Sequence, residues 1–398
     1  MNVSGVLASS RIAVSAQTYT LEGMRNKIAG YAFQAASYAS DPLCYAHQSF
    51  REICVVDSVN PHSSFVTNLA KKVALFIGIT GWISLAFFTS LPGVALRFLG
   101  KQLQTVPYLY EQTCKVSKVL PSDRSFSLLS WNICGIPGGL SISDGGVLNW
   151  KYRLDAIVAK IIEKDADVNC LYEVFDTQMA FYICEALKKR GYTDFYFNMH
   201  PREVGLSAGI FVASKYAVKN PQFTLFPQDS LVGRTKLAAK GVFQADLESQ
   251  GAVFASVFAT HLQHSEEPKF PSAEEISARS KQMQIIVDKI NQVRDRCVAV
   301  AGDWNLDDRE YAAAPWRPLF QKGDIGIIEK TWGGDEFCAK LAGRRPSSPL
   351  NLDYTVFLRG TARSIVTSLV KTGFDPTVFK KEALSDHAGQ FSRIQLLP

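Results

Sequence analysis

The stretch VAVAGDWNLDD, residues 298–308, is where the fold can be read most directly from the sequence. Five small apolar residues, 298–302, predict a buried β-strand, and the polar residues Asp303 and Asn305 follow it at once. Alternate residues of an extended chain share a face, so we expect these two side chains on one side and Trp304 on the other. A carboxylate there can hold a water or a metal ion, and a carboxamide can hold an oxyanion. An Asx turn that only ends the strand is the alternative.

Further apolar runs also end in reactive residues. The runs FSLLSWN (126–132), ADVNCLYE (166–173) and GAVFASVFATH (251–261) end in Asn132, Glu173 and His261. Two shorter phrases near the C-terminus, NLDY (351–354) and SDH (385–387), add Asp353, Asp386 and His387. An active site is commonly assembled in this way, from strand ends that are distant in sequence.

These motifs, in this order, resemble the endonuclease/exonuclease/phosphatase superfamily over about residues 125–398. The phrases YEVFD (172–176), AGIFVASK (208–215), KGVF (240–243) and THLQ (260–263) are most similar to the bacterial neutral sphingomyelinases. The resemblance implies an α/β fold whose core is a two-layered, mostly antiparallel β-sandwich flanked by helices. It also implies magnesium-dependent cleavage of a phosphate ester.

The resemblance further implies which residues hold the metal. Glu173 is the leading magnesium ligand, with Asn132 beside it, because magnesium needs only one or two carboxylates and keeps several waters. Asp386 is expected to reach the same coordination shell, since adjacent strand residues face opposite ways and His387 points elsewhere. The alternatives are a charged residue just past a strand end for Glu173 and a turn cap for Asn132.

The remaining residues would carry the catalytic roles. Asp303 would orient or deprotonate the attacking water, and Asn305 would hold a phosphoryl oxygen. His387 would act as a general base or polarise the phosphate, with Asp353 fixing its tautomer. His261 would bind the phosphate or protonate the leaving oxygen, unless it is only a hydrogen-bonded histidine at a strand end.

Other polar residues are interpreted more conservatively. Four histidines without such partners are expected to be structural: His47, His62, His200 and His264. Arg234 and Lys240 lie in a basic, Gly-containing stretch that either meets the substrate phosphate or forms a solvated face.

Composition sets limits on the class of protein. The chain has 398 residues, of which 47% are hydrophobic and 20% charged, enough for one large domain and a smaller region. A net charge of +6 suits an anionic phosphate or a membrane surface but falls short of a dedicated nucleic-acid binder. None of the 8 cysteines forms a Cys-x-x-Cys pair, which argues against a zinc site. Most of them are expected to be reduced and structural, and a secreted, partly disulfide-bonded chain is the alternative.

The N-terminal part predicts a membrane-embedded segment. The first 20 residues lack an apolar core of signal-peptide length, so no cleavable signal is expected. Residues 73–96 carry no charged side chain and exceed the roughly 20 residues that a bilayer span requires. A buried hairpin of two short helices is the alternative. Residues 100–123 are expected to be a polar linker, and the predicted domains are 1–120, which includes the 73–96 segment, and 121–398.

The catalytic half alternates helical and strand patterns. Helices are predicted at 150–164, 178–190 and 272–293, the last opened by a capping box of Ser272 and Glu275. Strands are predicted at 207–218, 237–247, 252–260, 352–358 and 390–396. This alternation predicts a layered α/β architecture, whereas its sheet arrangement comes from the family resemblance.

The sequence therefore predicts a membrane-associated, Mg²⁺-dependent phosphodiesterase, sphingomyelinase-like, that acts on a phospholipid substrate. A nuclease on the same fold is the first alternative, with nucleic acid as its partner. A catalytically retired module that binds phospholipid or protein is the second. No protein partner and no cellular compartment can be inferred from the sequence, and fold-level resemblance does not choose among substrates.

Overall fold

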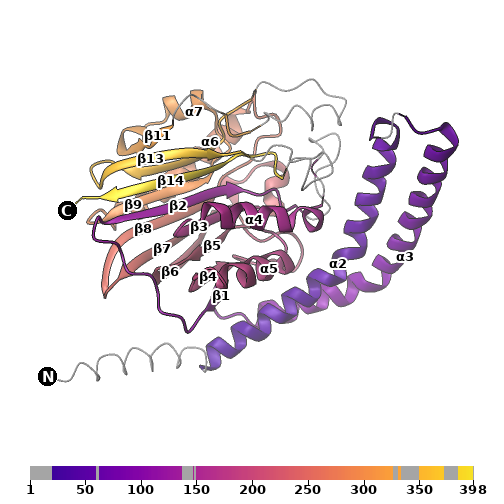
Figure 1. The fold of residues 1–398 in the computed structure, drawn as a ribbon, viewed down its shortest axis with the longest axis horizontal. Helices are drawn as coiled ribbons and strands as arrows, with labels where there is room; N and C mark the ends of the chain where they lie inside the picture. Colours follow the sequence, from indigo (N-terminus) through magenta and orange to yellow (C-terminus); the bar gives the residue numbers. More distant parts are fainter. Residues whose placement is uncertain are drawn as a thin grey trace.

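The protein folds into two packed β-sheets beside a long helical hairpin (Figure 1). The computed structural model describes residues 20–59, 62–136, 147, 149–325, 330–332, 349–371 and 384–397. The first 20 residues, in which no cleavable signal is expected, therefore lie almost wholly outside the described residues.

The larger sheet has eight strands in the order β1-β4-β5-β3-β2-β14-β13-β11. Neighbours pair antiparallel except β2 with β3 and β11 with β13, which pair parallel. The strands are β1 (Leu109–Gln112), β2 (Ser125–Asn132), β3 (Val168–Tyr172), β4 (Asp194–Phe197), β5 (Phe211–Ser214), β11 (Asp324–Ile325), β13 (Ala362–Val370) and β14 (Gly389–Leu396).

The smaller sheet has six strands in the order β10-β12-β9-β8-β7-β6. Its only parallel pair among the described strands is β8 with β9. The strands are β6 (Ala217–Leu225), β7 (Gly241–Ser249), β8 (Ala252–His261), β9 (Cys297–Asp303), β10 (Phe320–Lys322) and β12 (Asp353–Leu358).

Three hydrophobic cores hold the layers together. One core lies between the sheets and includes Leu128, Val212 and Ala299. A second packs the outer face of the larger sheet against α4 (Leu154–Lys164) and α5 (Thr177–Lys188), and a third packs the smaller sheet against α6 (Ala273–Ile290) and α7 (Asp308–Ala313). Short 3-10 helices occur at Trp150–Tyr152, Gln228–Ser230, Gly233–Leu237 and Arg317–Leu319. The layered α/β sandwich, with mostly antiparallel pairing, is confirmed.

The N-terminal region is a hairpin of two long helices, α2 (Leu21–Val59) and α3 (Phe65–Leu103). Ser64 caps α3 by accepting a hydrogen bond from the backbone of Thr67. In Figure 1 the hairpin starts below the sandwich and rises along one side of it. Residues 73–96 lie within α3, which is long and apolar enough to cross a membrane. One such helix is weak support for a membrane location by itself.

Several local predictions need correction. Residues 100–123 are not only a linker, because Leu109–Gln112 pairs with β4 as the edge of the larger sheet. The single strand predicted at 207–218 is two strands, β5 and β6, and β13 was not predicted at all. The capping box of Ser272 and Glu275 at the start of α6 is confirmed. The division at residue 120 stays a prediction.

Candidate active site

Strand register brings the predicted residues to one end of the sandwich. In the smaller sheet, parallel β8 places His261 opposite Asp303, and antiparallel β12 places Asp353 on the other side of Asp303. In the larger sheet, parallel β2 and β3 end side by side, at Asn132 and at the residue before Glu173. Strand ends from both sheets therefore meet at a common point.

Asp303 is the centre of this cluster. Its Oδ2 accepts a hydrogen bond from Nδ2 of Asn132 at 2.9 Å, and lies 3.5 Å from Nε2 of His261 and 3.7 Å from Nε2 of His387. The side chain is buried. One carboxylate oxygen thus faces an amide and two imidazoles, which fixes its position before any substrate arrives.

The backbone turns sharply after Asp303. Oδ1 of Asp303 accepts a hydrogen bond from the backbone of Asn305 at 3.0 Å, which is an Asx turn, and Asn305 adopts a positive φ of 53°. The expectation that the chain stays extended through Asn305 is therefore wrong. Trp304 is nevertheless directed into the core on the other side, where its ring stacks on Tyr354 at 5.0 Å. The turn both ends the strand and serves the site.

Gly302 allows the two parallel strands to approach closely beside this turn. A Cβ at this position would lie 2.2 Å from the carbonyl oxygen of Thr260 and 2.8 Å from the Trp304 ring. Only glycine fits such a contact without moving backbone. Gly302 is thus required by the packing that aligns Asp303 with His261.

His387 and Asp353 form a buried pair. Nδ1 of His387 lies 2.8 Å from Oδ2 of Asp353, and the backbone of His387 donates to Oγ of Ser385 at 3.1 Å. Burial disfavours the imidazolium, but the carboxylates of Asp353, Asp386 and Asp303 outweigh it and raise the pKa of His387 well above its usual range. Burial also raises the pKa of Asp353 to about 6, with His387 acting against that rise.

Glu173 faces the same point from the larger sheet. It adopts a positive φ of 62°, a strained conformation for a glutamate that is tolerated where surrounding structure enforces it. Burial, and then the neighbouring charge of Asp386, raise the pKa of Glu173 to about 7. Asp386 itself lies 3.9 Å from Nε2 of His387 and accepts a hydrogen bond from the Trp332 indole at 3.3 Å.

Asn132 fits both alternatives that the sequence left open, a turn cap and a residue of the site. Its Oδ1 accepts a hydrogen bond from the backbone of Cys134 at 2.9 Å, as in a turn, and its Nδ2 donates to Asp303. Asn132 also hydrogen-bonds Glu173, which favours the ionised carboxylate. In this arrangement Asn132 joins the carboxylates of the two sheets.

Two further residues lie in the cluster: Lys240, for which the sequence left a phosphate contact or a solvated face open, and His264. Lys240 is buried, and burial lowers its pKa to about 7, against the attraction of Asp303 and Glu173. His264, expected to be structural, hydrogen-bonds Asn305. Partial burial and then the charge of Lys240 lower the pKa of His264. The signal for Lys240 was its place directly before a buried strand.

The carboxylates suit a divalent cation. Ligand atoms of Glu173, His261 and Asp303 lie within 4.8 Å of one another. Burial, and then the charge of Asp386, raise the pKa of Glu173 by disfavouring its charged form, which a bound cation would stabilise. Hard carboxylate oxygens from Glu173 and Asp386 are the donor type that magnesium takes.

A buried arginine supports the loops that carry these residues. Arg279 on α6 donates from Nη1 to the carbonyl oxygen of Gln263 at 3.2 Å and to Oγ of Ser265 at 2.7 Å. Its Nε and Nη2 donate to the two carboxylate oxygens of Glu310 on α7, at 2.9 and 2.6 Å. Arg279 therefore connects the loop after His261 with the helix that follows Asn305.

Comparison with solved structures confirms the fold. A mutant of beta toxin from Staphylococcus aureus with bound magnesium ions is 20% identical, with a TM-score of 0.55 over 67% of this chain and 99% of that one. Sphingomyelinase C from Streptomyces griseocarneus is also 20% identical, with a TM-score of 0.53 over 68% and 99%. No curated protein sequence matches this chain.

The sequence profile of the Endonuclease/Exonuclease/phosphatase family matches residues 129–387. That match spans more than half of the chain and contains Asn132, Glu173, Asp303 and His387. The chain belongs to the endonuclease/exonuclease/phosphatase family.

Proposed function

We propose that this chain is a magnesium-dependent phosphodiesterase that hydrolyses the headgroup ester of a phospholipid at a membrane surface. The observation that supports it most is the meeting of Asp303, His261 and His387 at distances of 3.5 and 3.7 Å, with Glu173 beside them. Phosphodiester hydrolysis needs an activated water, charge neutralisation at the phosphoryl oxygens and help for the leaving oxygen.

The surroundings of each residue indicate which of these tasks it performs. Asp303 orients the attacking water and accepts its proton, because its carboxylate is fixed by Asn132 and by the turn at Asn305. His387, charged because of the carboxylates around it and held by Asp353, donates to a phosphoryl oxygen. Asn132 aligns Asp303 with Glu173.

Neutral donors complete the site. Burial, and then the charges of Lys240 and His387, lower the pKa of His261 well below its usual range. His261 and Asn305 therefore bind phosphate oxygens without adding charge. Glu173 and Asp386 would hold magnesium, which when bound neutralises charge on the phosphoryl and leaving oxygens.

A phospholipid is favoured as the substrate by the apolar surface of α3. The most apolar part of this helix is only 6% buried, although a helix of a soluble protein would cover such a surface. A chain held at a bilayer meets lipid headgroups at high effective concentration. The fold of Sphingomyelinase C from Streptomyces griseocarneus agrees with such a substrate, although it alone does not select one.

A parallel release assay tests the proposal. Full-length protein is incubated with sphingomyelin vesicles, phosphatidylcholine vesicles and plasmid DNA, each with magnesium or with chelator. We expect phosphorylated headgroup release from lipid that requires magnesium and is lost in Asp303→Asn. The matched control is Asp295→Asn, since Asp295 is an exposed aspartate outside the site.

The other outcomes distinguish the alternatives. Nicking of DNA without headgroup release would identify a nuclease on this fold. Activity that persists in chelator would contradict magnesium dependence. No turnover of any substrate by a folded protein would indicate a retired binding module.

A further inference from the structure

The hairpin of α2 and α3 presents apolar side chains outward along most of α3. Large exposed residues on it include Phe76, Ile77, Ile83, Phe87, Phe88 and Leu91. The only charged residues of α3 before these are Lys71 and Lys72. A surface of this kind is stable only when something apolar covers it.

Contacts between the two helices fix which residues lie at the same level. The rings of Tyr45 and Trp82 lie 5.0 Å apart, and Oγ1 of Thr89 donates to the carbonyl oxygen of Ala39 at 2.7 Å. Near the turn of the hairpin, Lys72 pairs with Asp57 at 2.6 Å. The apolar run of α3 therefore lies alongside the middle and second half of α2.

The catalytic sandwich covers the other side of α2 at these same levels. Asp41 pairs with Lys151 at 2.7 Å, and the backbone of Asn149 donates to Oε1 of Gln48 at 3.3 Å. Ser37 hydrogen-bonds Asp176, which caps α5. Polar groups of the sandwich thus lie directly behind the helix that pairs with the apolar run.

This arrangement excludes a bilayer that surrounds the hairpin. Lipid around residues 73–96 would have to enclose the Asp41–Lys151 ion pair and the adjoining surface of the sandwich. It would also enclose Arg51 and Glu52 of α2, and charged side chains are costly inside a membrane. Among the described helices only α3 has the length and composition of a span. Figure 1 shows the sandwich beside the hairpin rather than beyond its end.

We propose that the hairpin lies flat in one leaflet, with the outer face of α3 in the lipid and α2 between α3 and the sandwich. The turn at residues 62–64 then stays on the same side of the membrane as the sandwich. Helices that lie in the interface in this way bury one apolar face to the depth of the headgroup and acyl boundary. The choice of lipid over a second copy of the chain rests on the proposed function.

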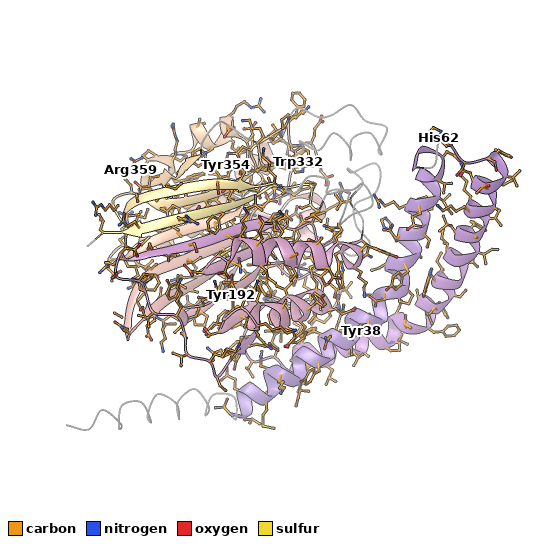
Figure 2. The ribbon with its side chains drawn as sticks, viewed as in Figure 1. Tyr38, His62, Tyr192, Trp332, Tyr354 and Arg359 are labelled. Carbon is orange, nitrogen blue, oxygen red and sulfur yellow. The ribbon has the colours of Figure 1, made fainter. Side chains whose placement is uncertain are left out.

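The flat position also directs the catalytic end of the sandwich toward the membrane. Trp332, which donates to Asp386, lies at the end of the sheets nearest the hairpin in Figure 2. Arg359, at the other end of β12, lies at the far end of the same view. A headgroup at the surface of the leaflet would therefore face the end of the sheets where Asp303 lies.

Cysteine labelling of the full-length chain tests this topology. Cys54 and Cys338 are replaced by serine, Cys114 serves as the exposed reference, and the other cysteines, which are buried, stay unchanged. Two further variants lack Cys114 and carry Ser63→Cys in the turn or Phe87→Cys on the outer face of α3. Each protein is added from outside to sealed vesicles of phosphatidylcholine and sphingomyelin, then treated with a membrane-impermeant maleimide.

We expect the protein to float with the vesicles, and the thiols at positions 63 and 114 to react. The thiol at position 87 should be protected until detergent is added. Protection at position 63 until detergent would show that the hairpin crosses, and reaction at position 87 would show that its outer face is not in lipid. Either result overturns the flat arrangement.

Two controls separate this inference from the proposed function. Failure to float would overturn the lipid contact, and a stable dimer in solution would identify a second copy as the cover. Headgroup release from a short-chain, water-soluble substrate is measured on the same preparations. That activity would survive failure of the topology, whereas its absence would count against the phosphodiesterase.

Discussion

The catalytic end of the sandwich and the helix α3 depart in opposite ways from the usual distribution of charged and apolar residues. At the end of the sandwich, charged groups such as Asp303, Asp353 and Lys240 are buried. On α3, large apolar side chains such as Phe87 and Phe88 are exposed. Buried charge and exposed apolar surface are the informative exceptions to the usual distribution of residues.

On the proposed function, each region is completed by something outside the chain, the sandwich by a cation and α3 by lipid. Buried carboxylates are stabilised when a bound cation neutralises their charge. An exposed apolar helix is stabilised by lipid. If the cation site and the lipid contact are both correct, changes in the sandwich should lower the rate of hydrolysis on every substrate. Changes on α3 should lower only the rate on membrane-bound substrate.

The largest effect is expected for the pair Asp303 and His387. Each single alanine substitution should lower headgroup release on the order of 100-fold or more, because proton transfer and charge stabilisation are lost. The two residues act as one unit, so the double variant should cost little more than the worse single variant. Rates are measured on dispersed substrate, with Asp295→Asn as the control. Additive losses, or a large fall in melting temperature, would contradict the idea of a unit.

The next effect is expected for Glu173→Gln. Removal of this charge should lower activity roughly 10- to 100-fold at a fixed magnesium concentration and weaken the magnesium dependence. A magnesium titration of activity checks both statements. If the variant reaches half-maximal activity at an unchanged magnesium concentration, Glu173 does not hold the metal.

The raised pKa of Glu173 predicts a pH dependence of metal binding. Below its pKa of about 7 the carboxyl is protonated and protons compete with magnesium, so apparent affinity should fall as pH decreases. Since the folded-state pKa lies above the ordinary value, ionising Glu173 costs stability as pH rises toward 7. Magnesium should therefore raise the melting temperature more at pH 8 than at pH 5.5. Glu173→Gln should remove that difference.

A smaller loss is expected for Arg279, which holds the loops rather than the substrate. Arg279→Lys keeps the charge but cannot form the two-pronged contact with Glu310, and should lower activity about 10-fold. Arg279→Met breaks a buried pair and should cost about 3 to 5 kcal/mol of stability. Denaturant unfolding and rates of both variants are compared with Arg296→Lys, at an ion pair outside the site. Equal effects in the control would show that the contact has no special role.

Sequence reasoning predicted residues that the fold brings together, because these residues follow apolar runs. Asn132, His261 and Asp303 end strands whose apolar character is visible in the sequence, and register then brings them together. Lys240 could not be placed, because a lysine beside glycine has the same pattern on a solvated face and in a buried site. An Asx turn after Asp303 was only the alternative prediction, because its hydrogen bond depends on local geometry that an apolar run does not reveal, so the positive φ of Asn305 was not expected.

Prediction of the strands from the sequence was limited in the same way. Strands β9 and β8 are apolar and were predicted, whereas adjacent polar residues at 363–364 and 367–368 interrupt the apolar pattern of β13, and β1 is short. The pairing of β1 with β4 depends on contacts from distant parts of the chain, which periodicity does not encode. The packing of α2 against the sandwich is likewise a tertiary feature.

The smallest effect on chemistry is expected for the outer face of α3. The double change Phe87→Glu and Leu91→Glu should lower the rate on vesicles severalfold, because two charges oppose insertion of that face. Its rate on a short-chain, dispersed substrate should be unchanged, since both side chains are exposed on α3 and belong to no part of the site. Point changes are preferred to removal of residues 1–120, because Phe33 of α2 and Leu109 of β1 are packed in the core. Val366→Glu, at an exposed apolar residue on β13, controls for added charge. Equal loss on both substrates would mean that the hairpin supports the site itself, and the contrast between the two regions would then fail.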